Sequence, residues 1–199
     1  LRFGTFSIED LVKQAVKLEV KTLALTDINT ITGIYDFYEE CKKVGIKAVA
    51  GVEIRKENEL LYIALAKRFE GIGEVNRMLT EFNCNNVELP QVSPNFKENF
   101  IIYPMTNFPE ILEEHEFIGV RPEELNLLIK PEFRKFLDKM TVLHPVTFKT
   151  KQEYNLHRIL RAIDNNTLLS KLGENDVCKP TEVMKSEEEI RKIYRNYPQ

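Results

Sequence analysis

The stretch KTLALTDINTITGIYDFYEECKKVGIKAVAGVEI, residues 21–54, decides the fold. Residues 22–26 form a short apolar run that predicts a strand. Residues 31–44 carry apolar side chains at helical spacing and end before Gly45, which is suited to a left-handed helix cap. Residues 46–54 predict a second strand. A strand, a helix and a strand in this order are typical of a parallel α/β unit.

Outward from this stretch, predicted strands and helices alternate along most of the chain. Ser7 and Asp10 form a capping-box pattern before a helix, and Ser186 begins a second such pattern. The short charged linker 55–59 suggests that the strands on either side of it form a hairpin. We therefore expect an α/β fold with a parallel sheet, barrel-like or doubly wound. Further strands are expected at Leu60–Ala66, Phe100–Tyr103, Phe117–Val120 and Thr141–Val146, and further helices at Gly71–Phe82, Pro109–Glu114 and Lys151–Ile163.

The composition limits the classes of function. The chain has 199 residues and a formal net charge of −3, which does not favour a self-sufficient nucleic-acid binder. No apolar run reaches the roughly eighteen residues of a membrane span, so we expect no membrane association. The 3 cysteines show no CxxC spacing and predict reduced thiols in a cytoplasmic protein. No secretory signal opens the chain, although its first residue is Leu1 and a preceding segment is expected.

Asp27 and Glu53 are the best candidates for chemistry, because both lie near the ends of predicted strands, where ligands and metals collect in parallel α/β proteins. His144 is the one histidine at a predicted strand end. His115 lies in an acidic stretch and is expected to be solvated. For His157, a packed and hydrogen-bonded side chain is a better interpretation than a metal ligand.

Several segments, in order, resemble the PHP (polymerase and histidinol phosphatase) domain at the N-terminus of the bacterial DNA polymerase III alpha subunit. They are SIEDLVKQAVKLEVKTLALTDINT, GIYDFYEECKKVGIKAVAGVEI, ELLYIALAK, PVTFKTKQEYNLHRILRAIDNNTLLSKL and SEEEIRKIY. The resemblance spans nearly the whole chain. It implies a single PHP domain over residues 1–199, a fragment of a much longer polymerase chain, folded as a distorted (βα)7-type barrel.

The resemblance also implies where metal ligands would stand. Active members hold up to three metal ions with a His-x-His, a Thr-Asp-His, a Gly-x-Glu and a late Asp-x-His motif. In this chain the family's ligand types persist only at Asp27 and Glu53, with His144 just outside the pattern. The replaced positions are Phe3, Ile28, Pro145 and Thr147. We therefore expect a degenerate metal site, no catalytic residues and no cofactor, with Glu53 hydrated, paired or neutralised and Asp27 capping its loop.

Two functions follow from the resemblance. The first is a non-catalytic scaffold or docking domain in a replicative polymerase. Its partners would be the rest of the polymerase chain, a proofreading exonuclease subunit and other replisome proteins, with DNA bound through the full-length protein. The alternative is an active metal-dependent phosphoesterase or 3′–5′ exonuclease, whose divalent metal is held by an atypical site. DNA-binding residues are not indicated by the sequence.

Overall fold

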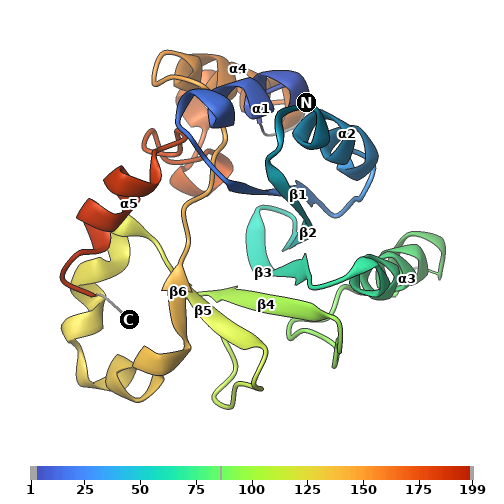
Figure 1. The fold of residues 1–199 in the computed structure, drawn as a ribbon, viewed down its shortest axis with the longest axis vertical. Helices are drawn as coiled ribbons and strands as arrows, with labels where there is room; N and C mark the ends of the chain where they lie inside the picture. Colours follow the sequence, from blue (N-terminus) through green and yellow to red (C-terminus); the bar gives the residue numbers. More distant parts are fainter. Residues whose placement is uncertain (1–3, 86, 198–199) are drawn as a thin grey trace.

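The computed structural model describes residues 4–85 and 87–197, and its centre is a curled, mixed six-stranded sheet (Figure 1). The strand order is the order of the chain, from β1 to β6. Helices α2 and α3 pack against β2 and β3. The strands are β1 (Thr22–Ile28), β2 (Lys47–Lys56), β3 (Glu59–Ala66), β4 (Asn99–Pro104), β5 (Glu116–Val120) and β6 (Met140–Val142).

The sheet is mixed because β3 runs against both of its neighbours, while β1 and β2 pair in parallel, as do β4, β5 and β6. The expected hairpin is confirmed: two residues, Glu57 and Asn58, connect β2 to β3, and so short a link joins only antiparallel strands. The expected α/β fold is confirmed, with a sheet that is mixed because β3 is antiparallel to β2 and β4. A barrel of seven βα units is not confirmed within the described residues.

Five α-helices surround the sheet in the described part of the chain: α1 (Ile8–Lys17), α2 (Ile34–Val44), α3 (Phe69–Asn85), α4 (Glu153–Asp164) and α5 (Glu187–Tyr194). Their predicted ends are largely confirmed. The Ser7 side chain accepts from the backbone N of Asp10, Gly45 ends α2 in the left-handed region, and Ser186 forms a complete capping box at α5. Short 3₁₀ helices cover 122–129, 131–139, 169–171 and 174–176.

Two predicted elements are wrong. Residues 109–114 form no helix, because the backbone N of Glu113 donates to the Glu116 side chain, 3.0 Å away, instead of extending a helical turn. The strand predicted for 141–146 ends at Val142. Leu143 still donates its backbone N–H to the Val120 carbonyl at 3.0 Å, but Pro145 has no N–H to donate to a neighbouring strand. The backbone N–H groups of Thr147 and Phe148 donate to the Glu182 carbonyl instead.

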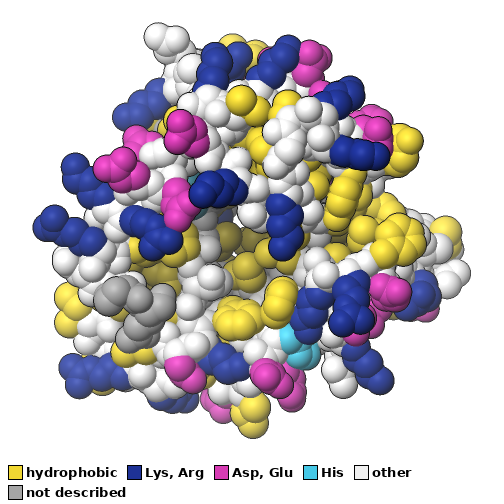
Figure 2. Space-filling model, viewed as in Figure 1, with side chains coloured by type: hydrophobic (Ala, Val, Ile, Leu, Met, Phe, Trp, Pro, Cys, Tyr) yellow, Lys and Arg dark blue, Asp and Glu magenta, His cyan; other side chains and the backbone are white. Residues whose placement is uncertain are grey.

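The core holds the strand ends in place. One buried cluster lies between β2, β3, β4 and α3, and a second joins α1 and α2 to the start of the sheet. A third lies under the 3₁₀ helices and α5. These buried clusters fix the positions of the strands, and therefore also the positions of the residues at the strand ends. No helix in the described ranges is long and apolar enough to cross a membrane. On the face shown in Figure 2, Lys and Arg side chains are interspersed with Asp and Glu side chains.

Candidate functional site at the strand tips

The carboxyl ends of β1 and β2 bring the predicted site residues together. In the parallel pair, Asp27 lies opposite Val52 and Ile28 opposite Glu53. The backbone N of Asn29 donates to the Glu53 carbonyl at 3.0 Å. The aliphatic Ile28 is therefore the immediate register partner of Glu53, as expected from two strands that run in the same direction.

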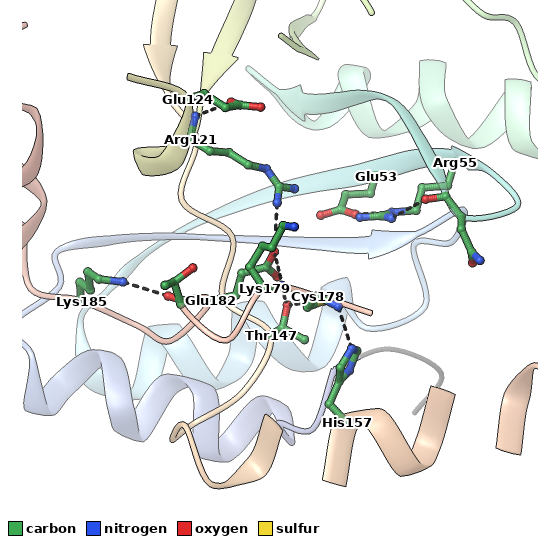
Figure 3. A network of polar contacts seen from close by, with 12 residues as sticks. Glu53, Arg55, Arg121, Glu124, Thr147, His157, Cys178, Lys179, Glu182 and Lys185 are labelled. Atoms are coloured by element: carbon green, nitrogen blue, oxygen red, sulfur yellow. Dashed lines mark hydrogen bonds and ion pairs between the residues drawn. The ribbon is translucent and has the colours of Figure 1, made fainter. Parts of the chain in front are cut away.

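Glu53 is paired with an arginine from its own strand. Arg55 Nε donates to Glu53 Oε2 at 2.8 Å, and both side chains are largely buried, 11% and 14% exposed respectively (Figure 3). Asn29 fixes this arginine by exchanging two hydrogen bonds, of 2.7 and 2.9 Å, with its backbone. Arg55 Nη1 also donates to the Asn58 carbonyl at 3.2 Å. The expectation that the Glu53 carboxylate is hydrated, paired or neutralised is met by pairing.

A second ion pair, largely buried, lies at the same end of the sheet. Arg121, directly after β5, donates from Nη1 to Glu182 Oε1 at 3.0 Å, and the Thr147 hydroxyl donates to Glu182 Oε2 at 2.6 Å (Figure 3). The Glu182 side chain is 8% exposed. Thr147 and Glu182 come from two segments that lie beside the sheet, so this carboxylate connects β5 to both of them.

Cys178 and His157 are buried beside this network of contacts. The Cys178 thiol donates to the Thr147 hydroxyl at 3.3 Å, and burial raises the pKa of that thiol strongly. His157 Nε2 accepts from the backbone N of Cys178 at 2.9 Å and its side chain is fully buried. The prediction of a packed histidine at this position is confirmed. A thiol held protonated in this way is no nucleophile at neutral pH.

His144 lies beyond β6, in the same part of the molecule. Its Nε2 is 2.9 Å from the Val183 carbonyl and 3.3 Å from Lys185 Nζ. Burial lowers the pKa of His144, and the Lys185 charge lowers it further. The neutral ring can donate to the carbonyl or accept from the ammonium group, but one nitrogen cannot do both. His115 lies in a turn before β5 and is half-buried, so it is less solvated than expected.

Asp27 has a local structural contact. Its carboxylate accepts a hydrogen bond from the backbone N of Gly33, at the start of α2. Burial raises the pKa of Asp27, and this backbone bond offsets only part of the effect. The side chain is close to the Gly33 backbone, since a Cβ at residue 33 would lie 2.7 Å from Asp27 Oδ2. The predicted role of Asp27 as a cap for the following loop agrees with this contact.

Replacing Asp27 by asparagine should not destabilise the protein at pH 7. The amide oxygen can still accept from Gly33, and the buried charge is gone. Because the folded state raises this pKa, the wild-type carboxyl contributes stability below its unfolded value of about 4, and that contribution is lost as the pH rises through the folded value. In urea unfolding between pH 4 and 7, the free energy of unfolding of Asp27→Asn should therefore rise relative to that of the wild type as the pH rises. A variant whose free energy of unfolding falls relative to the wild type as the pH rises would contradict this assignment.

Comparison with known proteins decides the family. The family model described as "PHP domain" matches residues 1–117, more than half of the chain. The chain belongs to the PHP domain family. The match includes the strand tips that carry Asp27, Ile28 and Glu53. The expectation that one PHP domain extends over 1–199 stays a prediction.

Relatives of this PHP domain include DNA polymerase III alpha subunits. The DNA polymerase III subunit alpha of Staphylococcus aureus strain Mu50 is 26% identical over 187 residues, and that of strain COL is 28% identical over 184 residues. Each match covers 87% of this chain and 16% of the relative. The subunit of Buchnera aphidicola is 36% identical over 64 residues, which is 32% of this chain and 6% of the relative.

Among solved structures, a Bifidobacterium adolescentis protein provisionally described as a metal-dependent phosphoesterase aligns with a TM-score of 0.35 and 13% identity. The alignment covers 96% of this PHP domain and 91% of that protein.

The strand tips of this PHP domain do not fit a divalent metal cluster. The Glu53 carboxylate is bonded to Arg55, the Thr147 hydroxyl donates to Glu182, and Ile28 and Pro145 have no side-chain donor atom. In the described part of the chain, no three His, Cys, Asp or Glu side chains are grouped to hold a metal ion. Phe3, the remaining replaced position, lies outside the described residues.

Sequence reasoning missed Arg55, Arg121 and Glu182. Arg55 had a signal, because alternate residues of one strand point to one face and Glu53 is two positions before it. The charges of residues 55–59 favour a linker there, whereas β2 extends to Lys56. Arg121 and Glu182 are 61 positions apart, and no local pattern links them.

Proposed function

We propose that this chain is the PHP domain of a replicative DNA polymerase III alpha subunit, and that it serves as a non-catalytic scaffold in the cytoplasm. Its partners would be the polymerase part of the same polypeptide and a proofreading exonuclease, with DNA bound by the full-length protein. Similarity to alpha subunits over 87% of the chain supports the replication assignment. Because the chain spans 16% of those relatives, the polymerase activity itself would lie in other parts of such a protein.

The Arg55–Glu53 pair carries the proposal of a scaffold. A glutamate at a family ligand position is already bonded at 2.8 Å to a guanidinium group, which is always charged. A metal ion bound to Glu53 would lie close to this cation. At a separation of ~4 Å and an effective dielectric constant of ~20, each unit of metal charge would be repelled by about 4 kcal/mol. The pair therefore opposes the binding of a divalent ion and stabilises the carboxylate without one.

Elemental analysis and hydrolysis assays test the scaffold directly. Purified wild type and Glu53→Gln should both contain substoichiometric zinc and manganese. Both should hydrolyse bis-p-nitrophenyl phosphate and a 3′-labelled single strand at the rate of the no-protein control, and EDTA should leave the melting temperature unchanged. Stoichiometric zinc or manganese, lost together with hydrolysis in Glu53→Gln, would instead establish the metal-dependent phosphoesterase or exonuclease. Primer extension by the full-length polypeptide tests the replication assignment separately.

A further inference from the structure

Helix α4 turns two polar side chains inward and leaves three aliphatic ones exposed. Its buried residues are His157, which is fully buried, Arg161, which is 4% exposed, and the small Ala162. Leu156, Ile159 and Ile163 are exposed by 48%, 46% and 70%. Spacings of three and four residues place these three on one face of the helix. None of these three aliphatic side chains belongs to a buried hydrophobic cluster of the described residues.

The apolar surface continues past the end of α4. Leu168 and Leu169, at the start of the short 3₁₀ helix that follows, are 64% and 41% exposed. Between helix and loop lies a shallow, mostly apolar hollow, lined by Ile159, Ala162, Ile163, Asn166, Thr167 and Leu169. We call Leu156, Ile159, Ile163, Leu168 and Leu169 the α4 face. Other large exposed apolar residues, such as Tyr35, Phe69 and Ile111, are not part of it. A contiguous patch of this kind marks an interaction site more strongly than scattered residues do.

Three observations bear on what covers the α4 face. The PHP family model ends at residue 117, so α4 lies outside the matched segment. The similarity to polymerase alpha subunits covers 87% of the chain and therefore extends well beyond that residue. Those relatives are about six times as long as the matched region, since it makes up 16% of them. Helix α4 therefore lies outside the segment that the family model matches. It lies inside the region that is similar to much longer polymerase subunits.

We infer that the α4 face is covered by an apolar surface of the polymerase part of the same, longer polypeptide. This inference rests on the proposed function. The α4 face is suited to an aliphatic helix or loop placed in the hollow beside Ile163. A second copy of the chain is the weaker occupant, because a stable dimer buries about 800 Å² on each partner with about 20–30 residues a side, and the α4 face supplies five. Helix α4 lies at the upper edge of the molecule in Figure 1, away from β4, β5 and α3.

Cysteine labelling of the full-length polypeptide tests this inference. Ile163→Cys and the control Ile111→Cys place a thiol at two isoleucines that are 70% and 82% exposed in this domain. Both variants carry Cys84→Ser, which removes the exposed native thiol. After treatment with a maleimide, mass spectrometry of the two peptides measures the labelling rates. We expect residue 163 to react at least about tenfold more slowly than residue 111, because labelling requires the covering surface to open. Carbene footprinting of the unsubstituted polypeptide gives the same comparison without substitution at either site.

The outcomes separate this inference from the proposed function. Equal rates at 163 and 111 in a polypeptide that extends primers would overturn the inference alone. Protection that disappears on dilution would assign the face to a second copy, and protection that appears only when an exonuclease subunit is added would assign it to that subunit; either result overturns the inference. A full-length polypeptide that does not extend primers would reject the proposed function, and the inference with it.

Discussion

Replacing Arg161 by methionine should lower the free energy of unfolding by about 3–5 kcal/mol. Its guanidinium group connects three segments. It donates to the Asp164 side chain at 2.6 Å, to the Asp176 carbonyl at 2.8 Å and to Asn58 Oδ1 in the β2–β3 turn at 2.9 Å. Methionine keeps most of the buried volume but leaves these acceptors without the charged donor, and such hydrogen bonds are individually worth about 1.5–3 kcal/mol.

Arg191→Met is the matched control for this substitution. Arg191 pairs with Glu187 at 2.8 Å, but the two side chains are 77% and 66% exposed on α5. Exposed pairs of this kind contribute about 0–1 kcal/mol, so the control should unfold close to the wild type in urea. Equal losses for Arg161→Met and Arg191→Met would show that the buried contacts of Arg161 do not hold the turn, α4 and residues 174–176 together.

The β1–α2–β2 unit could be predicted because its signals are local. Helical spacing through Phe37 and Cys41, the cap at Gly45 and two apolar runs all lie within 34 residues. Once two parallel strands are paired, the adjacency of Ile28 and Glu53 follows from the register alone. The sequence alone therefore places Asp27, Ile28 and Glu53 at neighbouring strand ends, as the structure has them.

The remainder depends on contacts between distant segments. Nothing near Arg121 indicates Glu182, and nothing near Arg161 indicates Asn58, which is 103 positions away. The polar pattern of α4 was visible, with His157 beside Leu156, but periodicity alone does not say which face of a helix is turned inward. Hydrogen bonds allow the side chains of His157 and Arg161 to face inward, because they satisfy polar groups that a core would otherwise exclude.

Glu182→Met should also cost about 3–5 kcal/mol of unfolding free energy, because it leaves the largely buried Arg121 cation without its carboxylate. The Thr147 hydroxyl loses its acceptor at 2.6 Å in the same substitution. Arg121→Met leaves the opposite charge unpaired, in a side chain that is 8% exposed. Both single substitutions should therefore be severe for the same physical reason, and urea unfolding at constant pH and salt measures each of them.

The double substitution Arg121→Met with Glu182→Met separates a paired network from two independent contacts. With neither charge present, no uncompensated ion is buried, so the double variant should lose clearly less than the sum of the two single losses, with a coupling of about 1–3 kcal/mol. Glu9 and Lys13, a pair on α1 whose side chains are 65% and 63% exposed, provide the control cycle and should couple by no more than about 0.5 kcal/mol. Additive losses at Arg121 and Glu182 would mean that the two charges do not stabilise one another. Some interaction other than this ion pair would then have to hold the carboxyl end of β5 to residues 178–182.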